Sequence, residues 1–261
     1  MKKIVYSDLD GTLLDHRTYS FAPAKKALNL LRKHKVPLIV CTSKTRSEIE
    51  FWRRQIGNID PFISENGGGI FIPQDYFDFD VPFDDEDSKY YIITLGIDYG
   101  KLLYLYSILK KEYDIQSFFD MSTEEIAHDT GLPKPQAALA KKREYGLPFK
   151  INNKDQEQEI TKFIEKQGYR ITEGGRYYHL LGNNDKGKAV TILSRLYQRQ
   201  YGALHSIGIG DSANDFDMLN VVDSAYLVMK KDGSYASSEY TLAGGIGPDG
   251  WEKAIEREMK L

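Results

Sequence analysis

The 261-residue sequence predicts an α/β protein in which a Rossmann-like parallel sheet forms the core and an α+β domain is inserted into it. Two observations predict this fold. Short apolar runs alternate with amphipathic helices from the N-terminus to Pro82, and the same alternation returns at Asp185. Between these points strands and helices follow one another in the mixed order of an α+β segment. A chain of this length buries roughly three quarters of its unfolded surface, so both parts can have a hydrophobic core.

The first three elements predict the start of a parallel sheet. Residues 3–7 are apolar and β-branched, and they end in polar residues from Asp8 onward, as a buried strand does. Residues 22–34 predict a helix, because Pro23 favours a helix start and the alanines and leucines lie on one stripe. Residues 36–41 predict a second buried strand. The order strand, helix, strand is that of a parallel unit.

A hairpin and a domain boundary follow. A helix at 46–55 leads to a strand at 62–64, and the glycine-rich turn at 65–69 joins it to a strand at 70–72. An acidic stretch at 84–87 then crosses to a segment of different character. We therefore assign residues 1–82 and 185–261 to the core and residues 83–184 to the inserted domain.

The inserted segment mixes strands and helices. In chain order we expect a strand at 90–95, helices at 100–113, from 122 and at 135–142, a strand at 149–151, a helix at 155–167, and strands at 169–172 and 176–181. The core pattern then resumes with a helix at 186–200, strands at 206–209 and 225–229, and a helix after Pro248. Gly244, Gly245 and Gly247 predict a loop, and not a P-loop, because no Lys-Ser or Lys-Thr pair follows them.

Composition excludes several classes of function. Lysine and arginine number 35 against 38 aspartates and glutamates, and a net charge of -3 provides no general attraction for nucleic acid or for an anionic membrane surface. The chain has one cysteine, Cys41, so an internal disulfide is impossible, and the N-terminus reaches charged residues too early for a signal peptide. We expect a cytoplasmic protein that acts on a small molecule.

Polar clusters follow the predicted core strands or open the next helix, which is where parallel sheets collect their working groups. These residues are Asp8, Asp10, Thr42, Ser43, Lys186, Asp211 and Asp215. Several carboxylates at one edge repel one another unless a cation lies among them, and hard oxygen ligands suit Mg²⁺. A carboxylate beside such an ion, a lysine and a hydroxyl can transfer a phosphoryl group, although these residues do not show which acid attacks.

Two other interpretations of the acidic motif are weaker. Acids are common in turns, but chance places Asp-x-Asp-Gly-Thr in a chain of this length on the order of once in a thousand sequences. An EF-hand needs glycine at its sixth position and glutamate at its twelfth, and the sequence has Leu13 and Tyr19 there. The motif therefore indicates a catalytic site.

Four motifs of the sequence form a recognisable set: Asp8-Leu9-Asp10-Gly11-Thr12, Thr42, Asp185-Lys186-Gly187 and Gly210-Asp211-Ser212-Ala213-Asn214-Asp215. With these motifs the sequence resembles the haloacid dehalogenase superfamily of phosphatases. The inserted segment resembles the C2-type cap of the Cof-like branch. Within that branch, the stretches at 42–46, 65–69, 140–145 and 174–179 are similar to the mannosyl-3-phosphoglycerate phosphatases.

The resemblance implies roles for the core residues. Asp8 is expected to be the nucleophile that forms an aspartyl-phosphate, and Asp10 the general acid and base. Thr42 and Lys186 are expected to hold the phosphoryl oxygens. Mg²⁺ is expected on the Asp8 carboxylate, the Asp10 backbone carbonyl and Asp211, and Asn214 and Asp215 are expected to support the site.

The cap residues are expected to select the substrate. Arg143 lies beside Tyr145, and Arg176 precedes two tyrosines and His179; arginine forks bind carboxylates and phosphates at two points. With the core residues Ser43, Lys44 and Asn66, the candidates for substrate binding are therefore Arg143, Arg176 and His179. The sequence departs from the resemblance in two places. Gly146 and Leu147 precede Pro148 where a small polar residue and an acid are expected, and Ser43 replaces a common glycine.

The expected activity is Mg²⁺-dependent hydrolysis of mannosyl-3-phosphoglycerate to mannosylglycerate and phosphate, in the synthesis of a compatible solute. The same core motifs serve three alternatives: phosphatases for glucosyl-3-phosphoglycerate, for sucrose phosphate or for hexose phosphates. A phosphomannomutase would need a bisphosphate activator. A non-catalytic binding module is disfavoured by the intact Asp8, Asp10, Lys186 and Asp211. The sequence leaves the oligomeric state open.

Overall fold

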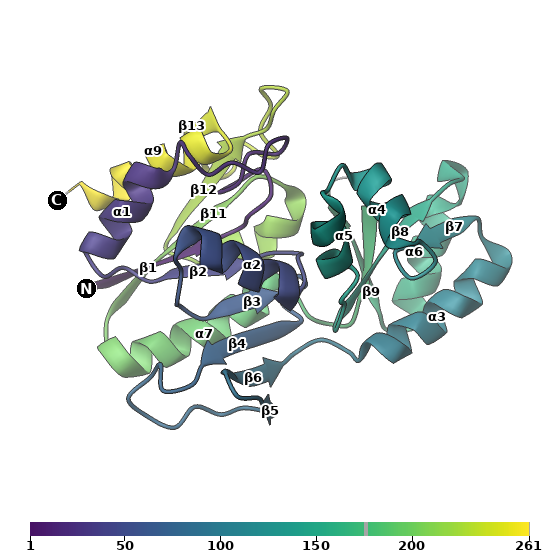
Figure 1. The fold of residues 1–261 in the computed structure, drawn as a ribbon, viewed down its shortest axis with the longest axis horizontal. Helices are drawn as coiled ribbons and strands as arrows, with labels where there is room; N and C mark the ends of the chain where they lie inside the picture. Colours follow the sequence, from purple (N-terminus) through teal and green to yellow (C-terminus); the bar gives the residue numbers. More distant parts are fainter. Residues whose placement is uncertain (175–176, 261) are drawn as a thin grey trace.

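Two β-sheets organise the chain (Figure 1). The computed structural model describes residues 1–174 and 177–260. Within these residues the larger sheet has nine strands and the smaller sheet has four. In sheet order the larger one consists of β13 (Thr241–Ile246), β12 (Ser224–Met229), β11 (Leu204–Gly210), β1 (Lys2–Ser7), β2 (Leu38–Cys41), β3 (Phe62–Ser64), β4 (Gly69–Pro73), β6 (Tyr90–Thr94) and β5 (Asp85–Glu86).

The centre of the larger sheet is parallel. β1 pairs with β11 on one side and β2 on the other, and the strands from β13 to β3 all run the same way. The hairpin predicted at 62–72 forms as β3 and β4, with Phe62 opposite Phe71. Because β1, β2 and β11 are parallel, the loops after them meet at one edge of the sheet.

Helices cover both faces of this sheet. α1 (Lys25–Lys33), α2 (Arg46–Ile56) and α9 (Pro248–Met259) pack on the face that carries Val5, Val40 and Ile207. α7 (Lys186–Tyr201) and α8 (Phe216–Leu219) pack on the other face. Successive side chains of β1 alternate between the two cores, as the pleat of a strand requires. The predicted α/β class with a parallel core is confirmed.

The smaller sheet is antiparallel and lies beside the larger one (Figure 1). Its strands, in sheet order, are β7 (Ile115–Ser117), β8 (Gly146–Ile151), β10 (Tyr177–Leu181) and β9 (Arg170–Gly174). α3 (Tyr99–Glu112) and α6 (Glu157–Lys166) pack on one of its faces, and α4 (Thr123–Thr130) and α5 (Lys134–Ala140) belong to a separate cluster around Tyr177. Short 3₁₀ turns occur at Lys154–Gln156 and Ala213–Asp215.

Two predicted assignments differ from the structure, and a further strand was not predicted. The predicted boundary at residue 83 assigned β5 and β6 to the inserted domain, but β6 pairs with β4 along its whole length and extends the larger sheet. The predicted glycine loop at 244–247 includes part of an edge strand, β13, which pairs with β12. β7 was not predicted, because three residues at the end of a helix carry no alternating pattern. Strand partners far along the chain decide these assignments.

The helices are short or amphipathic. Among residues 1–174 and 177–260, none combines the length and the apolar character that a membrane crossing requires.

Candidate active site

Three aspartates meet at the edge of the larger sheet. Asp8 follows β1, Asp211 follows β11, and Asp215 ends the 3₁₀ turn after Asp211. Each offers a carboxylate oxygen within 4.8 Å of the others. The parallel pairing of β1 with β11 brings together residues that lie about two hundred positions apart in the sequence.

Lys186 lies among these acids. It opens α7, and its Nζ is 3.0 Å from Asp8 Oδ1 and 2.6 Å from Asp215 Oδ1. The side chain is completely buried. Burial opposes its charge, but Asp215 and Asp8 outweigh burial and raise the pKa of Lys186 above its usual value. The lysine is therefore a fixed cation at the centre of the cluster.

The loop after β11 is held by Asp215. Its Oδ2 accepts from the backbone N–H groups of Asp211 and Ser212, at 3.0 and 3.2 Å. Its Oδ1 accepts from Lys186. Because both oxygens already have protein partners, Asp215 positions the lysine and the loop that carries Asp211.

The cluster has more negative charge than Lys186 balances. Burial raises the pKa of Asp8 to about 6, against the opposing effect of Lys186. Burial, together with Asp215 and Asp8, raises the pKa of Asp211 to about 8. Gly11, at φ +74°, allows this approach, since a Cβ there would lie 2.9 Å from Asp211 Oδ2. Buried oxygen donors that resist ionisation in one another's presence fit a divalent cation, which would restore the charge balance.

Asp10 points to a different partner. Its Oδ2 is 2.7 Å from Lys44 Nζ, and its Oδ1 is buried without a hydrogen-bond partner among the described residues. Lys44 also lies 3.4 Å from Glu48 Oε1. Burial opposes the charge of Lys44, but Asp10 and Glu48 outweigh it and raise the pKa of this lysine. One carboxylate oxygen of Asp10 thus remains available to a reacting group.

Thr42 and Ser43 follow β2, beside the loop after β1. Thr42 is buried; its N–H donates to Ile63 and its carbonyl accepts from Asn66. The Ser43 carbonyl accepts from Arg143. The structure therefore brings both residues to the same edge as the acids.

The turn between β3 and β4 presents an amide. Asn66 is buried; its Oδ1 accepts from Asn214 at 3.5 Å, and its Nδ2 has no partner among the described residues. Glu65 and Asn66 have positive φ angles of 47° and 56°, a conformation that costs energy in non-glycine residues. Asn184 stabilises the turn by donating to the carbonyls of both. The strained turn delivers a free donor to the Asn214 side of the site.

The predicted cap residues lie in different surroundings. His179 is buried on β10, and burial, Arg143 and Lys186 lower its pKa to about 3, so its imidazole is neutral at pH 7. Arg143 is buried against Glu48 of α2 and the carbonyl of Ser43 in the loop after β2. The predicted residue Arg176 lies outside the described residues.

Sequence analysis missed three residues at the site: Glu48, Glu65 and Asn184. The sequence contains a local signal for Glu48, because Thr45-x-x-Glu48 is the pattern of a helix capping box. The structure forms both hydrogen bonds of this box. Glu65 accepts from the backbone N–H groups of Glu144 and Tyr145. No local pattern predicts that contact, since it joins segments that meet only in the tertiary fold.

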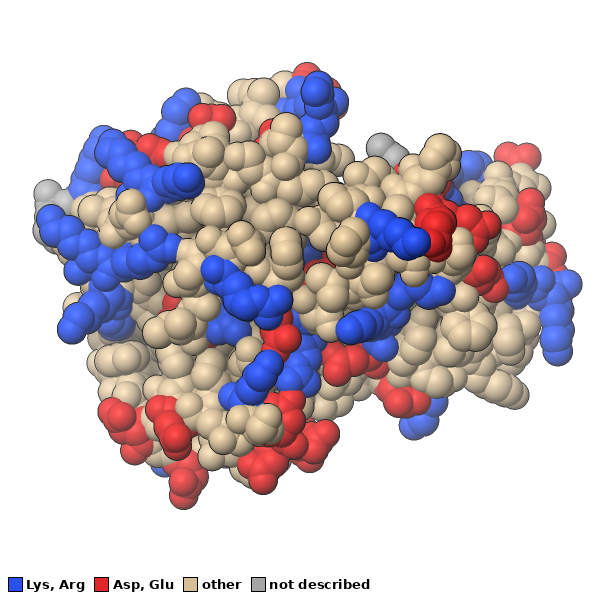
Figure 2. Space-filling view, viewed as in Figure 1, with Lys and Arg blue, Asp and Glu red and all other residues tan. Residues whose placement is uncertain are grey.

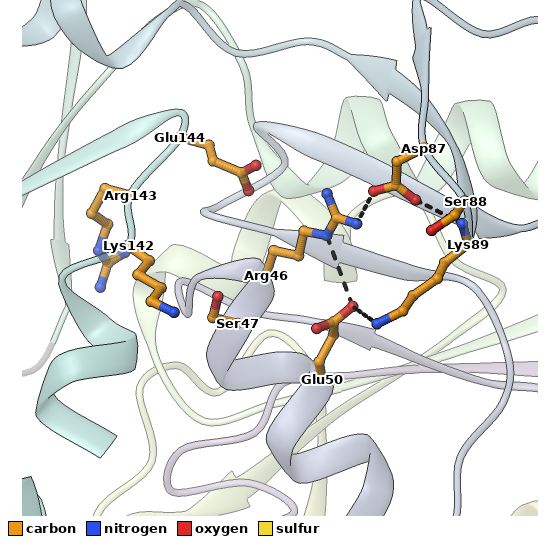
Figure 3. A pocket seen from close by; sticks show the side chains of 9 residues that line it. All are labelled: Arg46, Ser47, Glu50, Asp87, Ser88, Lys89, Lys142, Arg143 and Glu144. Atoms are coloured by element: carbon orange, nitrogen blue, oxygen red, sulfur yellow. Dashed lines mark hydrogen bonds and ion pairs between the residues drawn. The ribbon is translucent and has the colours of Figure 1, made fainter. Parts of the chain in front are cut away.

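A cavity of about 540 Å³ opens between α2 and residues 142–144, and its described lining includes none of the three aspartates (Figure 3). Arg46, Ser47 and Glu50 of α2 line one side, and residues 142–144 line another. Arg46 is ion-paired with Asp87 and Glu50 there. Figure 2 shows lysine and arginine mixed with aspartate and glutamate over one face, so that this face carries both signs of charge.

A parallel α/β core with clustered acids at its carboxyl edge, and a second sheet inserted beside them, defines the class of capped α/β hydrolases. A family model described as haloacid dehalogenase-like hydrolase matches residues 5–233. The chain belongs to this family, as the sequence predicted.

Curated relatives cover almost the whole chain. A glucosyl-3-phosphoglycerate/mannosyl-3-phosphoglycerate phosphatase of Methanococcoides burtonii is 43% identical over 98% of this chain and 96% of its own length. A protein of the same description from Persephonella marina is 39% identical over 97% of this chain and 96% of its own. A mannosyl-3-phosphoglycerate phosphatase of Pyrococcus horikoshii is 38% identical over 87% of this chain and 91% of its own.

Solved structures share the fold. A haloacid dehalogenase-like hydrolase from B. subtilis superposes with a TM-score of 0.72 at 17% identity, covering all of both chains. A sugar phosphatase of haloacid dehalogenase subclass IIB gives 0.67 at 16% identity, covering 98% of this chain and 99% of its own. These identities support the fold alone.

Proposed function

We propose that this enzyme is a phosphoric monoester hydrolase that releases phosphate from mannosyl-3-phosphoglycerate, and from glucosyl-3-phosphoglycerate as well. The observation that carries the proposal is Asp8 held beside Lys186 at 3.0 Å, with Asp10 two residues further on. One carboxylate oxygen of Asp10 has no partner in the part of the chain that the structure describes. Relatives named for both substrates, at 43% and 39% identity, support the substrate class.

In the proposed reaction a carboxylate oxygen of Asp8 bonds to phosphorus while the phosphorus–oxygen ester bond breaks. Asp10 donates a proton to the leaving oxygen of the glycosylglycerate. A water molecule then attacks the aspartyl-phosphate, Asp10 accepts its proton, and phosphate leaves with Asp8 regenerated. Two carboxylates with different partners, Lys186 and Lys44, fit these two roles.

Other core residues support the phosphoryl group. Lys186 and the Thr42 hydroxyl neutralise and orient its oxygens, since a fixed cation stabilises charge most effectively where water is excluded. Asp215 holds Lys186, and Asn214 reaches the turn that carries Asn66. We assign a supporting role to Asn214 and Asp215 for this reason.

We propose Mg²⁺ as the divalent cation, held by the Asp8 carboxylate, Asp211 and the Asp10 backbone carbonyl. When bound, it supplies positive charge to the phosphoryl oxygens. The donors are all oxygens, and burial raises the pKa of Asp8 and of Asp211, so a hard cation fits them.

The smaller sheet and its helices act as a cap over the phosphoester. We place the cap between β6 and α7. Ser43, Lys44 and Asn66 from the core, with Arg143, Arg176 and His179 from the cap, remain the candidates for substrate binding. Neutral His179 and the Nδ2 of Asn66, which has no partner among residues 1–174 and 177–260, can hydrogen-bond sugar hydroxyls without a charge. The single cysteine, buried in β2, suits a reducing compartment such as the cytoplasm.

Phosphate release tests the proposal. The substrates are mannosyl-3-phosphoglycerate, glucosyl-3-phosphoglycerate, sucrose 6-phosphate and mannose 6-phosphate, each with Mg²⁺ and no bisphosphate activator. We expect the two glycosyl-phosphoglycerates to give the highest kcat/KM and Asp8→Asn to abolish turnover, because the amide cannot attack. A preference for mannose 6-phosphate would refute the substrate assignment, and more than a few per cent residual activity in Asp8→Asn would refute the nucleophile.

A further inference from the structure

Arg143 is a cap residue whose side chain is bound to the core. Its Nη1 donates to the Ser43 carbonyl at 2.8 Å, and its Nε donates to Ala140 within the cap at 2.9 Å. Nη2 lies 3.8 Å from Glu48 Oε2. The side chain is only 6% exposed. Arginine has five N–H groups, and protein groups of the core and of the cap already engage this guanidinium.

We propose that Arg143 is a positioning residue, which holds the segment 43–48 so that Lys44 keeps Asp10 in place when the cap is closed. This inference rests on the proposed function, since it concerns the geometry of the proposed acid and base. It differs from the expectation that Arg143 binds the substrate.

A continuous ionic chain supports the proposal. From Asp10 it runs to Lys44 at 2.7 Å, from Lys44 to Glu48 at 3.4 Å, and from Glu48 to Arg143 at 3.8 Å. The side chains of Lys44, Glu48 and Arg143 are each no more than 6% exposed. Buried charges interact strongly, and removing one partner costs folding free energy because the other charge stays buried without compensation. The position of Lys44 therefore depends on what Glu48 contacts on its other side.

The backbone carbonyls at the start of the same segment also depend on the cap. The carbonyls of Thr42 and Lys44 accept from the N–H groups of Asn66 and Glu65, both within the core. The Ser43 carbonyl between them accepts from Arg143 instead. Two of three consecutive carbonyls are thus fixed within the core, and the third is fixed by the cap.

The cap reaches this segment at further points. Thr45 Oγ1 donates to the Leu139 carbonyl at the end of α5, at 3.0 Å. In the core, Glu65 accepts from the N–H groups of Glu144 and Tyr145, and its carboxylate lies 4.0 Å from Arg143. Because these contacts link the cap to residues 43–48 and 65, closing the cap assembles the supports of Lys44.

The neighbouring Lys142 provides a matched control. Figure 3 shows both residues on the cap side of the cavity, opposite Ser47 of α2. Lys142 is exposed, and Arg143 is bound to the core. Lys142→Ala removes a cation from the same cavity, and among the described residues the Lys142 side chain has no hydrogen bond or ion pair with the segment 43–48.

The experiment compares Arg143→Ala, Arg143→Lys and Lys142→Ala in the full-length protein. Hydrogen exchange of the 43–48 amides reports the support directly, without any substrate. We expect exchange of these amides to be at least tenfold faster in Arg143→Ala and little changed in Lys142→Ala. Arg143→Lys should recover part of the protection, because an ammonium can donate to Ser43 but cannot also reach Glu48. Unchanged exchange in Arg143→Ala would overturn the proposal, whatever substrate the enzyme uses.

Kinetics provide the second measurement. We expect kcat of Arg143→Ala to fall on the order of 10- to 100-fold, as small misplacements of a catalytic group do, with KM nearly unchanged. In a Lys44→Gln background the same change should have little further effect, because the chain to Asp10 is already broken. A large rise in KM with unchanged kcat would instead assign Arg143 to the substrate. Absence of phosphate release by the wild-type enzyme would refute the proposed function. The hydrogen-exchange result would still show whether Arg143 holds the segment 43–48.

Discussion

Replacing Asp211 with asparagine should stabilise the metal-free protein at alkaline pH and remove its response to Mg²⁺. Asparagine has the same shape, and its Oδ1 can still accept from Ser212, which donates to Asp211 Oδ1 at 3.1 Å. The substitution removes one negative charge from a buried cluster that includes Asp8 and Asp215. It therefore reduces the repulsion without opening a cavity.

The magnitude follows from the pKa of Asp211, which rises from an ordinary value of 3.8 to about 8. At about 1.4 kcal/mol per pH unit, that difference corresponds to about 6 kcal/mol. Asp211 is partly exposed, and solvent screens part of the repulsion, so we expect about 3 kcal/mol. For a chain of this length, that change raises Tm by about 6–12 °C.

The dependence on pH has a definite sign. The folded protein retains a proton on Asp211 between about pH 4 and pH 8, whereas the unfolded chain has lost it. Stability of the metal-free wild type should therefore fall as pH rises through that window, and Asp8, with a pKa of about 6, contributes to the same fall. A bound cation replaces the protons, so stabilisation by Mg²⁺ should be larger at pH 8 than at pH 5.

Thermal unfolding from pH 5 to 8.5, in EDTA and in Mg²⁺, measures both effects. Asp217→Asn is the control, because Asp217 pairs with Arg170 at the surface at 3.3 Å and should change stability by less than about 1 kcal/mol. A lower Tm for Asp211→Asn than for wild type in EDTA at pH 8 would refute the charge argument. A full Mg²⁺-induced rise in Tm in this variant would show that Asp211 does not bind the metal.

The other predictions concern Lys186, Asn66 and Gly67. Lys186→Met should lower the free energy of unfolding by about 3–5 kcal/mol at pH 8 in EDTA and by less at pH 5, because two buried carboxylates lose their partner. Equal losses at both pH values in urea unfolding would contradict this prediction. Asn66→Ala should raise KM roughly tenfold by removing the Nδ2 donor, which no described residue engages, and unchanged steady-state kinetics would exclude that contact with the substrate. Gly67→Ala should cost about 3 kcal/mol, since its Cβ would lie 2.1 Å from the Asp185 carbonyl oxygen at φ +85°, whereas Gly131→Ala, with open space at φ +75°, should cost about 1 kcal/mol.

The sequence determined the elements whose signals are local. The apolar runs of β1, β2 and β11 and the amphipathic pattern of α7 identified the parallel core, because burial on one or both faces leaves a periodic record in the chain. The polar residues that end those strands predicted the cluster of Asp8, Lys186, Asp211 and Asp215, since parallel strands bring their carboxyl ends to one edge. For these strands, the order of strands and helices along the sequence was enough to imply that they pair in parallel, although they lie far apart in the chain.

Only the tertiary structure decided the contacts between segments without such a record. β6 and β13 joined the larger sheet because strand partners distant in sequence were available to them. Glu65 accepts from the cap backbone, Arg143 donates to Ser43, and Asp10 pairs with Lys44 in place of the acidic cluster. Each of these contacts forms because the tertiary fold brings a charged side chain to its partner in a buried space. Burial makes such interactions strong and specific. The sequence shows which residues are charged but not how far apart they lie in the fold.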